Sequence, residues 1–318
     1  MPGEFELIRR FFTRPAPHAL LGVGDDAALI DLTPGMSLAI STDMLVSGRH
    51  FFSDVDPYLL GRKSLAVNLS DMAAMAARPR WATLALALPT VDETWLEHFS
   101  RGFFSLADEY KVELIGGDTT AGPLNICVQI MGEVAPAQAL RRDGAKVGDD
   151  IWVSGELGAA ALALHAMQNK IVLSSDSLAR CALRLHDPSP RVALGLALRG
   201  ISQCAIDVSD GLLADLGHIL ERSHLGAEIQ FFDVPCSVDV REFVDQPLGK
   251  QALLAGGDDY ELCFTAPENR RNDIEQIGVK INLPLSRIGR IVAGDKLIVH
   301  DEQGREINME YAGFDHFN

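Results

Sequence analysis

A glycine-glycine-aspartate elbow occurs twice in this chain of 318 residues, each time directly after a short apolar run. Gly116-Gly117-Asp118 follows Leu114-Ile115, and Gly256-Gly257-Asp258 follows Leu253-Leu254-Ala255. Glycine lets the backbone turn sharply and approach a phosphate closely, and successive N–H groups in such a turn can bind an anion. The repeat therefore predicts turns at which a carboxylate stands close to a bound phosphate.

Four further turns combine acidic side chains with glycine or hydroxyl residues. They are Gly24-Asp25-Asp26, Ser41-Thr42-Asp43, Asn68-Leu69-Ser70-Asp71 and Asp207-Val208-Ser209-Asp210-Gly211. A single Gly-Asp is in roughly 80% of cases only a turn. Clustered carboxylates, however, repel one another unless cations lie between them, and oxygen ligands of this kind suit Mg²⁺ held together with substrate phosphates. Taken jointly, the six turns predict a metal–polyphosphate site assembled from many loops.

The composition favours a globular enzyme and argues against two other classes of protein. With 28 basic and 44 acidic residues the net charge is −16, whereas a general nucleic-acid binder needs a basic face. No apolar stretch approaches the ~18 residues of a membrane span. The five cysteines form no Cys-x-x-Cys pair, which argues against a zinc ribbon, and most lie in apolar runs. Buried reduced thiols are typical of a cytoplasmic protein, and neither a nucleic acid nor a membrane is expected as a partner.

The order of predicted elements indicates two mixed α/β halves. Residues 136–150, rich in Arg, Gly and Asp, are the best linker, so we expect domains at 1–138 and 139–318. Asp56-Pro57 is a typical helix start, and Asn68 and Asp71 are three residues apart and should share one face of that helix. Helices are predicted at 4–12, 57–75, 92–110, 158–168, 177–185, 190–199 and 212–222. Strands are predicted at 27–32, 37–45, 81–88, 113–115, 124–134, 151–154, 205–208, 227–231, 261–265, 288–292 and 296–300.

Two common phosphoryl-transfer folds are excluded by missing motifs. Gly249-Lys250 lacks the upstream glycine and the following hydroxyl of a P-loop. No His-Arg-Asp and Asp-Phe-Gly pair is present, which argues against a protein kinase.

The complete series of turns resembles the thiamine-monophosphate kinase family. The matching stretches are Gly24-Asp25-Asp26-Ala27-Ala28, Ser41-Thr42-Asp43, His50-Phe51, Ala66-Val67-Asn68-Leu69-Ser70-Asp71, Gly116-Gly117-Asp118-Thr119-Thr120, Asp207-Val208-Ser209-Asp210-Gly211-Leu212 and Gly256-Gly257-Asp258-Asp259-Tyr260-Glu261-Leu262. The resemblance implies a two-domain α/β (α+β) fold shared with aminoimidazole ribonucleotide synthetase, with mixed sheets flanked by helices. The first domain would carry ATP, metal and the dimer contact, and the second would complete the active site. The implied reaction is ATP-dependent conversion of thiamine monophosphate to thiamine diphosphate by a homodimer.

The resemblance also implies roles for individual residues. Several Mg²⁺ ions would be shared by Asp26, Ser41, Thr42, Asp43, Asp71, Asp118, Asp207 and Asp210. ATP would be contacted by Gly117, Asp118, Arg142 and Ser209, and thiamine monophosphate by His50, Asp258 and Tyr311. Asp258 stands where members often carry Glu, and Tyr311 where some carry Trp, which bears on the geometry of substrate binding.

The chemistry of the acceptor predicts direct transfer without a covalent enzyme intermediate. A phosphate monoester has a second pKa of ~6, so it is already a nucleophilic anion near neutral pH and needs no strong base. The obstacle is repulsion between two polyanions, which metal ions and Arg142 would offset while aligning the attack. Asp118 and Asp210, together with Arg142, are expected to support the transition state. Two alternatives stay open at this point. One is another ATP-dependent enzyme of the same fold, and the other is a non-catalytic relative that binds Mg–nucleotide.

Overall fold

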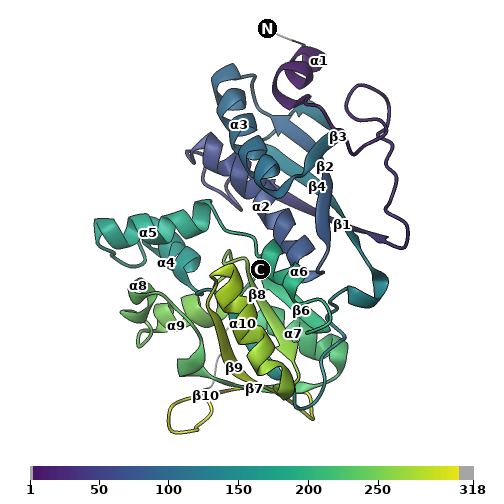
Figure 1. The fold of residues 1–318 in the computed structure, drawn as a ribbon. Helices are drawn as coiled ribbons and strands as arrows, with labels where there is room; N and C mark the ends of the chain where they lie inside the picture. Colours follow the sequence, from purple (N-terminus) through teal and green to yellow (C-terminus); the bar gives the residue numbers. More distant parts are fainter. Residues whose placement is uncertain (1–2, 308–318) are drawn as a thin grey trace. The chain divides into compact units, whose positions relative to one another are not determined.

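The computed structural model describes residues 3–307 and consists of two compact units (Figure 1). The first contains residues up to 72 together with 77–137, and the second contains residues 73–76 together with those from 138 onward. Tyr311, predicted above to contact the substrate, lies outside the described residues. Mixed sheets flanked by helices in two units confirm the predicted α/β architecture.

The first unit is built on a four-stranded sheet of order β1-β4-β2-β3. Its strands are β1 (Ser37–Val46), β2 (Arg78–Leu88), β3 (Glu113–Ala121) and β4 (Asn125–Val134). β4 pairs antiparallel with β1 and β2, whereas β2 and β3 are parallel and joined through helix α3 (Glu93–Tyr110). β1 and β3 are therefore the two edges of this sheet, which decides where the predicted ligands lie.

Helices cover one face of this sheet and an irregular segment lies on the other (Figure 1). α2 (Pro57–Ala74) begins at the predicted Asp-Pro start, where Asp56 Oδ1 accepts the Tyr58 N–H at 2.8 Å. α1 (Glu4–Leu7) continues into one π-helical turn, η1 (Ile8–Phe12).

The predicted strand at 27–32 is wrong: this stretch belongs to the segment 13–36, which we call the strap, and makes only the isolated bridge Leu21–Leu29. Its apolar residues Ala28 and Ile30 instead pack on the buried sheet residue Trp81 and its neighbours. Tertiary packing, rather than strand pairing, explains its apolar pattern.

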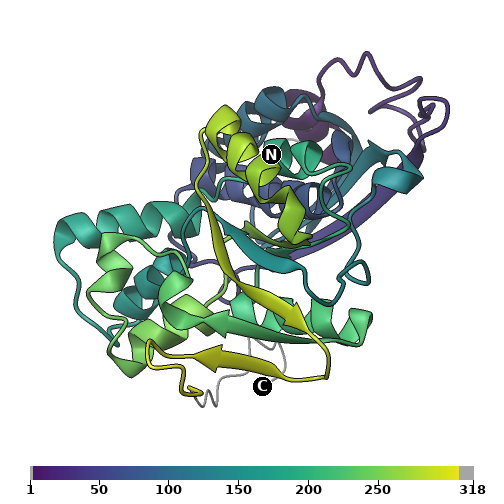
Figure 2. The same ribbon diagram turned by 60° about the horizontal axis from the view of Figure 1, so that its bottom comes forward.

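The second unit has a six-stranded sheet of order β10-β7-β9-β5-β8-β6, in which only the β10–β7 pair is parallel. The strands are β5 (Asp150–Ser154), β6 (Cys204–Val208), β7 (Gly226–Gln230), β8 (Glu261–Ala266), β9 (Leu285–Val292) and β10 (Leu297–His300). Figure 2 brings the yellow strands β9 and β10 into view. β5 and β8 are inner strands of this sheet and β6 is one of its edges, and all three are buried along their whole length. Such burial is expected where both faces of a sheet are covered.

Between residues 138 and 307, seven α-helices pack on this sheet and on one another. They are α4 (Ala159–Met167), α5 (Ser175–His186), α6 (Val192–Ala197), α7 (Leu212–Ser223), α8 (Val238–Arg241), α9 (Pro247–Ala255) and α10 (Arg271–Ile281). Three-residue 3₁₀ turns occur at Pro136–Gln138, Phe231–Asp233 and Glu268–Arg270. The helices α8, α9 and α10 were not predicted from the sequence. Within the described part of the chain, no helix is both long and apolar enough for a bilayer crossing.

An ion pair between α5 and α8 gives a prediction for acid stability. The guanidinium of Arg180 donates to both carboxylate oxygens of Asp239, at 2.6 and 2.9 Å, and lowers the pKa of this buried aspartate from 3.8. A lowered pKa in the folded state contributes stability that is present above the unfolded pKa and is lost as the pH falls through the folded one. We expect Asp239→Asn to lower the urea midpoint of unfolding at pH 7. The difference in midpoint between variant and wild type should disappear below about pH 4. Asp233→Asn, at an exposed site of the same unit, is the control and should show neither effect. A difference in midpoint that stays constant down to pH 2.5 would show that the Arg180–Asp239 ion pair is not its cause.

Candidate active site

The alternation of β1 divides the Ser41-Thr42-Asp43 motif between two faces of the sheet. Ser41 and Asp43 face α2, where the Ser41 hydroxyl donates to Asp71 Oδ2 and the Asp43 N–H donates to the Asn68 amide oxygen at 3.3 Å. Asn68 and Asp71 thus share one face of α2, as predicted. Thr42 points to the opposite face and accepts from Gln129 Nε2 at 3.4 Å. The first edge of the sheet therefore gathers Ser41, Asp43 and Asp71.

The first Gly-Gly-Asp motif lies inside β3 rather than beyond its end, because the strand extends to Ala121. Gly117 has φ +151°, and a Cβ there would lie 1.9 Å from the carbonyl oxygen of Leu84 on β2. The glycine is thus required for close approach of the two strands. The exposed Asp118 follows it, paired in register with Ala85.

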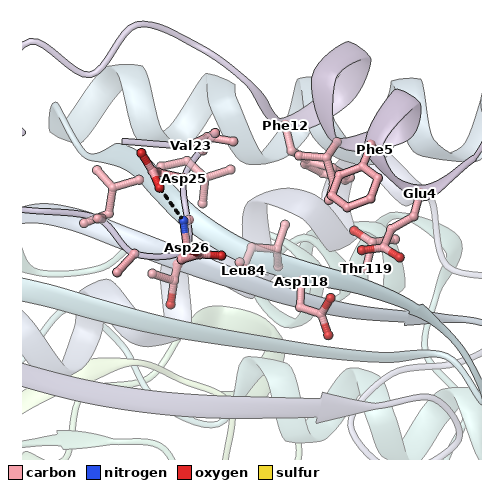
Figure 3. A pocket seen from close by; sticks show the side chains of 18 residues that line it. Glu4, Phe5, Phe12, Val23, Asp25, Asp26, Leu84, Asp118 and Thr119 are labelled. Atoms are coloured by element: carbon pink, nitrogen blue, oxygen red, sulfur yellow. Dashed lines mark hydrogen bonds between the residues drawn. The ribbon is translucent and has the colours of Figure 1, made fainter. Parts of the chain in front are cut away.

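A cavity of about 540 Å³ opens beside β3 (Figure 3). Its lining combines the carboxylates of Glu4, Asp25, Asp26 and Asp118 with the apolar side chains of Phe5, Ile8 and Phe12. Asp26, Gly117 and Asp118, three of the predicted site residues, therefore line one space. A lining that mixes carboxylates with aromatic surface suits a ligand with a charged and an aromatic part.

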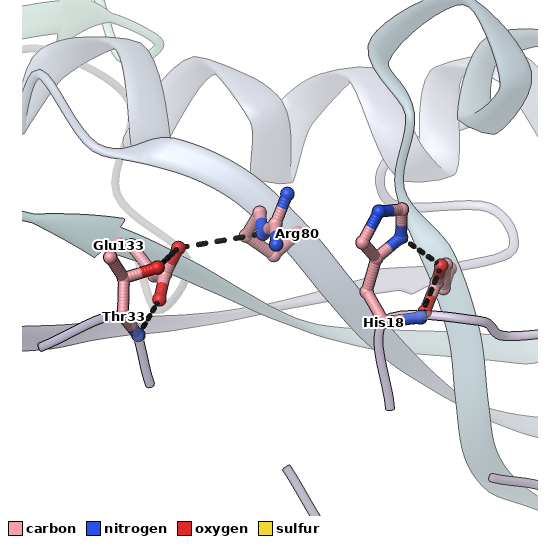
Figure 4. Close-up of polar contacts among 5 residues, drawn as sticks. His18, Thr33, Arg80 and Glu133 are labelled. Atoms are coloured by element: carbon pink, nitrogen blue, oxygen red, sulfur yellow. Dashed lines mark hydrogen bonds and ion pairs between the residues drawn. The ribbon is translucent and has the colours of Figure 1, made fainter. Parts of the chain in front are cut away.

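Two carboxylates of the sheet fasten the strap that carries Asp26 (Figure 4). Near its start, Glu113 of β3 accepts the His18 N–H at 3.0 Å and contacts the His18 ring nitrogen Nδ1. Near its end, Glu133 of β4 accepts the N–H and hydroxyl of Thr33 at 2.6 and 3.1 Å and pairs with Arg80 at 3.5 Å. These anchors hold an irregular segment in one path across the sheet, which places Asp26 at the cavity.

The two acidic groups of the first unit occupy opposite edges of its sheet. Cross-strand register runs from Asp118 on β3 through Ala85 and Cys127 to Met44 on β1, next to Asp43. Three strand spacings of ~4.8 Å separate β1 from β3, which is about 14 Å. Among residues 3–307, no three His, Cys, Asp or Glu side chains are grouped closely enough to hold a metal ion. One ion cannot bridge both edges within a single chain, although the oxygen donors at each edge are of the kind that Mg²⁺ prefers.

In the second unit the other two predicted elbows are joined by hydrogen bonds. The Asp258 N–H donates to the Ser209 carbonyl and the Tyr260 N–H to the Val208 carbonyl, both at 2.8 Å. Asp258 and Tyr260 have φ of +67° and +51°, left-handed values that are uncommon for non-glycine residues, and the Tyr260 hydroxyl lies 3.3 Å from Asp258 Oδ1. The sequence predicts that the first Gly-Gly-Asp elbow contacts ATP and the second contacts thiamine monophosphate. In the structure the second elbow packs against Asp207-Val208-Ser209-Asp210-Gly211.

Asp215 is a residue that the sequence reading missed. Its Oδ2 accepts the N–H groups of Ser209, Asp210 and Gly211, each at 3.0 Å. Burial raises its pKa to about 7, against the opposing effect of these hydrogen bonds. An aspartate in the first turn of the helix after the elbow was the available signal, because such a position suits N-terminal capping.

The remaining predicted residues have simpler surroundings. His50 is partly buried and its Nδ1 accepts the Val46 N–H at 3.0 Å, which orients the ring at the end of β1. Asp207 is buried in β6 opposite Leu262. The Arg142 side chain is exposed, and its carbonyl oxygen accepts from the Ser223 hydroxyl at 2.8 Å.

The chain is similar to known proteins along nearly its whole length. Residues 24–134 match the AIR synthase related protein, N-terminal domain, and residues 146–302 match the AIR synthase related protein, C-terminal domain. The thiamine-monophosphate kinase of Salmonella typhimurium is 44% identical over 319 residues, covering 99% of this chain and 98% of the relative.

Two solved structures are similar over most of their length. The thiamine-monophosphate kinase from Stenotrophomonas maltophilia has a TM-score of 0.84 and 48% identity, covering 92% of this chain and 93% of that one. AaThiL complexed with AMPPCP and TMP has a TM-score of 0.79 and 29% identity, covering 90% of this chain and 89% of that one. With full-length identity at this level and the same two-domain fold, this chain belongs to the thiamine-monophosphate kinase family.

Proposed function

We propose that this protein transfers the γ-phosphate of ATP to thiamine monophosphate, giving ADP and thiamine diphosphate. Full-length identity of 44% to a thiamine-monophosphate kinase is the observation that carries this proposal. It is supported by the similarity to AaThiL, whose complex contains AMPPCP, an ATP analogue, together with TMP. The cavity beside β3, lined by both carboxylates and aromatic side chains, suits a nucleotide bound with cations.

The transfer is proposed to be direct and in line. The acceptor phosphate is already an anion near neutral pH, so the protein has only to align two polyanions and offset their repulsion. Gly117, Asp118, Arg142 and Ser209 are assigned to ATP, and Asp118, Arg142 and Asp210 to support of the transition state. His50, Asp258 and Tyr311 are assigned to thiamine monophosphate, whose cationic ring suits an acidic and aromatic neighbourhood.

Mg²⁺ is the proposed metal, because the side chains assigned to it offer only carboxylate and hydroxyl oxygens. Ser41, Asp43 and Asp71 at the β1 edge form one oxygen group, and Asp26 and Asp118 at the cavity form another. Thr42, Asp207 and Asp210 complete the assigned set. Bound Mg²⁺ would neutralise phosphate charge, and the carboxylates would hold it in place.

One incubation tests the reaction. The purified protein is mixed with MgCl₂, ATP and thiamine monophosphate, and the thiamine species are separated by chromatography. Thiamine diphosphate should form in step with ADP. Formation of neither product with Mg²⁺, or with Mn²⁺ in its place, would overturn the proposal, and AMPPCP binding without turnover would identify a non-catalytic relative.

We further propose that the protein acts as a homodimer that pairs through the open face of the first sheet. Large apolar side chains are exposed on this face and on the strap: Ile40 by 57%, Met44 by 53%, Leu20 by 67% and Leu29 by 55%. An exposed apolar group of this kind is typical of a protein–protein contact. The 14 Å separation of the two acidic groups is a second argument. In a dimer, the β1 edge of one chain could bring its oxygen group close to Asp26 and Asp118 at the β3 edge of the other chain.

The dimer is tested by charge insertion. Wild type should sediment as a dimer, and Ile40→Glu should shift it to monomer, because a carboxylate would be buried without a partner. Val279→Glu, at an 85% exposed apolar site on α10 in the other unit, is the matched control and should leave the dimer intact. A monomeric wild type at micromolar concentration, or an unaffected Ile40→Glu variant, would contradict the proposed contact.

A cytoplasmic location is proposed from the cysteines. All five are described and none is in a disulfide. Burial raises the pKa of the Cys181, Cys204 and Cys263 thiols, which keeps them protonated. Inert reduced thiols fit a reducing compartment.

A further inference from the structure

The Ser209-Asp210-Gly211 turn has the backbone geometry of an anion-binding nest. Its three consecutive N–H groups converge on a single point, which is Oδ2 of Asp215 at 3.0 Å from each nitrogen. Convergent N–H groups ahead of a helix are a common way of binding phosphate. Here the chain's own carboxylate, 3% exposed on α7, occupies that position. A phosphate therefore cannot use these three donors while Asp215 holds them.

The consequence is that this elbow can recognise a ligand through side chains and not through its N–H groups. Because the N–H groups of this turn are directed to Asp215, the elbow residues assigned to ATP and metal, Ser209 and Asp210, would act through their side chains. The turn cannot relax easily, because Gly211 has φ +118° and a Cβ there would meet the Ala255 backbone at 2.6 Å. Asp215 thus fixes the direction in which two of the assigned residues project.

The same carboxylate also acts on the second Gly-Gly-Asp elbow. The carbonyl of Ser209, in the turn that Asp215 holds, accepts the Asp258 N–H at 2.8 Å. A Cβ on Gly257 would lie 2.3 Å from that carbonyl oxygen, so the close packing of the two elbows requires glycine at this position. Displacement of the first turn would move Asp258, the residue assigned to the thiamine end.

We propose that Asp215 is a positioning residue: an internal carboxyl group that fills the nest of the Ser209-Asp210-Gly211 turn and so sets the side chains of both elbows for phosphoryl transfer. The role in transfer rests on the proposed function, whereas the filled nest is a property of the fold alone. Residues that orient metal or phosphate ligands typically contribute 10- to 100-fold to activity.

Chemical rescue provides the decisive experiment. Asp215→Ala removes the carboxylate and leaves three unpaired N–H groups around a small space, which formate can fill. We expect Asp215→Ala to lower kcat for thiamine diphosphate formation by about 10- to 100-fold, and sodium formate to restore a substantial part of it in a saturable manner. Sodium chloride at equal ionic strength should not. Asp239→Ala, which removes another buried aspartate of the same unit, is the matched control and should show no rescue by formate.

Two measurements keep the proposal testable if the alanine variant fails to fold or if wild type proves inactive. Asp215→Asn keeps the shape of the side chain with a neutral acceptor, and should lower kcat more than it raises the KM for ATP. Hydrogen exchange of the amides of residues 209–211 does not depend on activity, and should be faster in Asp215→Asn than in wild type. Unchanged exchange would overturn the filled nest whatever the enzyme assay gives. Faster exchange with wild-type kcat and KM, or a folded Asp215→Ala without formate rescue, would overturn the positioning role.

Discussion

Replacement of Asp118 by Asn is expected to lower thiamine diphosphate formation by about 10²-fold or more, with the fold intact. The substitution removes one negative charge from the lining of the cavity and keeps the size of the side chain. Asp118 is exposed, so its packing contributes little to stability, and the melting temperature should stay close to that of wild type. The measurement is kcat and KM for both substrates over a range of MgCl₂ concentrations. Because a weakened metal contact is overcome in part by more metal, the deficit should shrink as MgCl₂ rises.

A matched substitution separates this effect from loss of charge in general. Asp295→Asn lies in an exposed turn of the second unit and should leave kcat within twofold of wild type, a margin typical of neutral surface changes. Normal turnover by Asp118→Asn at low MgCl₂ would show that the assignment of Asp118 is wrong.

A variant at Asp43, on the opposite edge of the sheet, tests whether the proposed dimer shares its active sites between chains. Asp43→Asn should be as inactive as Asp118→Asn. If each site combines the β1 edge of one chain with the β3 edge of its partner, a mixed dimer of the two variants contains one intact site. Random mixing would then restore about a quarter of wild-type activity, since half of the dimers are mixed and each has one working site. If co-expression of the two variants restores no kinase activity, the active site is not shared between chains. The proposed dimer would then have no role in catalysis.

Gly117→Ala is expected to destabilise the first unit strongly and to abolish activity. The added methyl group would lie 1.9 Å from the Leu84 carbonyl oxygen, so β3 must move away from β2. Displacement of a paired edge strand should cost about 3 kcal/mol or more of unfolding free energy. It should also abolish turnover, because Asp118 follows directly on the same strand. Thermal unfolding and the kinase assay measure the two effects.

The neighbouring glycine is the control. A methyl group on Gly116 would lie 3.6 Å from Thr83 Cγ2, which is an ordinary van der Waals distance. Gly116→Ala should therefore cost no more than about 1 kcal/mol. Equal stability of the two alanine variants would show that the close approach at Gly117 is not a constraint on the sheet.

Local sequence patterns predicted the local features of this fold well. The start of α2 at Asp56-Pro57 and the common face of Asn68 and Asp71 follow from interactions within a few residues, so the chain encodes them nearby. The pattern at 27–32 was misleading because a local pattern does not show which distant residues a segment contacts. A short apolar run signals burial, and whether it pairs as a strand depends on what lies beneath it, here the sheet residues around Trp81.

By itself the sequence determined which carboxylate and hydroxyl side chains this protein places on or near glycine turns, its α/β fold class and its membership of a kinase family. Only the tertiary structure decided how those side chains are distributed. Strand order placed Asp43 and Asp118 at opposite edges of one sheet, and strand order depends on pairing between segments far apart in the chain. The turn after Asp207 closed around Asp215, which lies only a few residues further along. The sequence offers this aspartate as a helix cap, but several acidic side chains stand near the turn, and the packing of the whole unit decides which of them accepts its N–H groups.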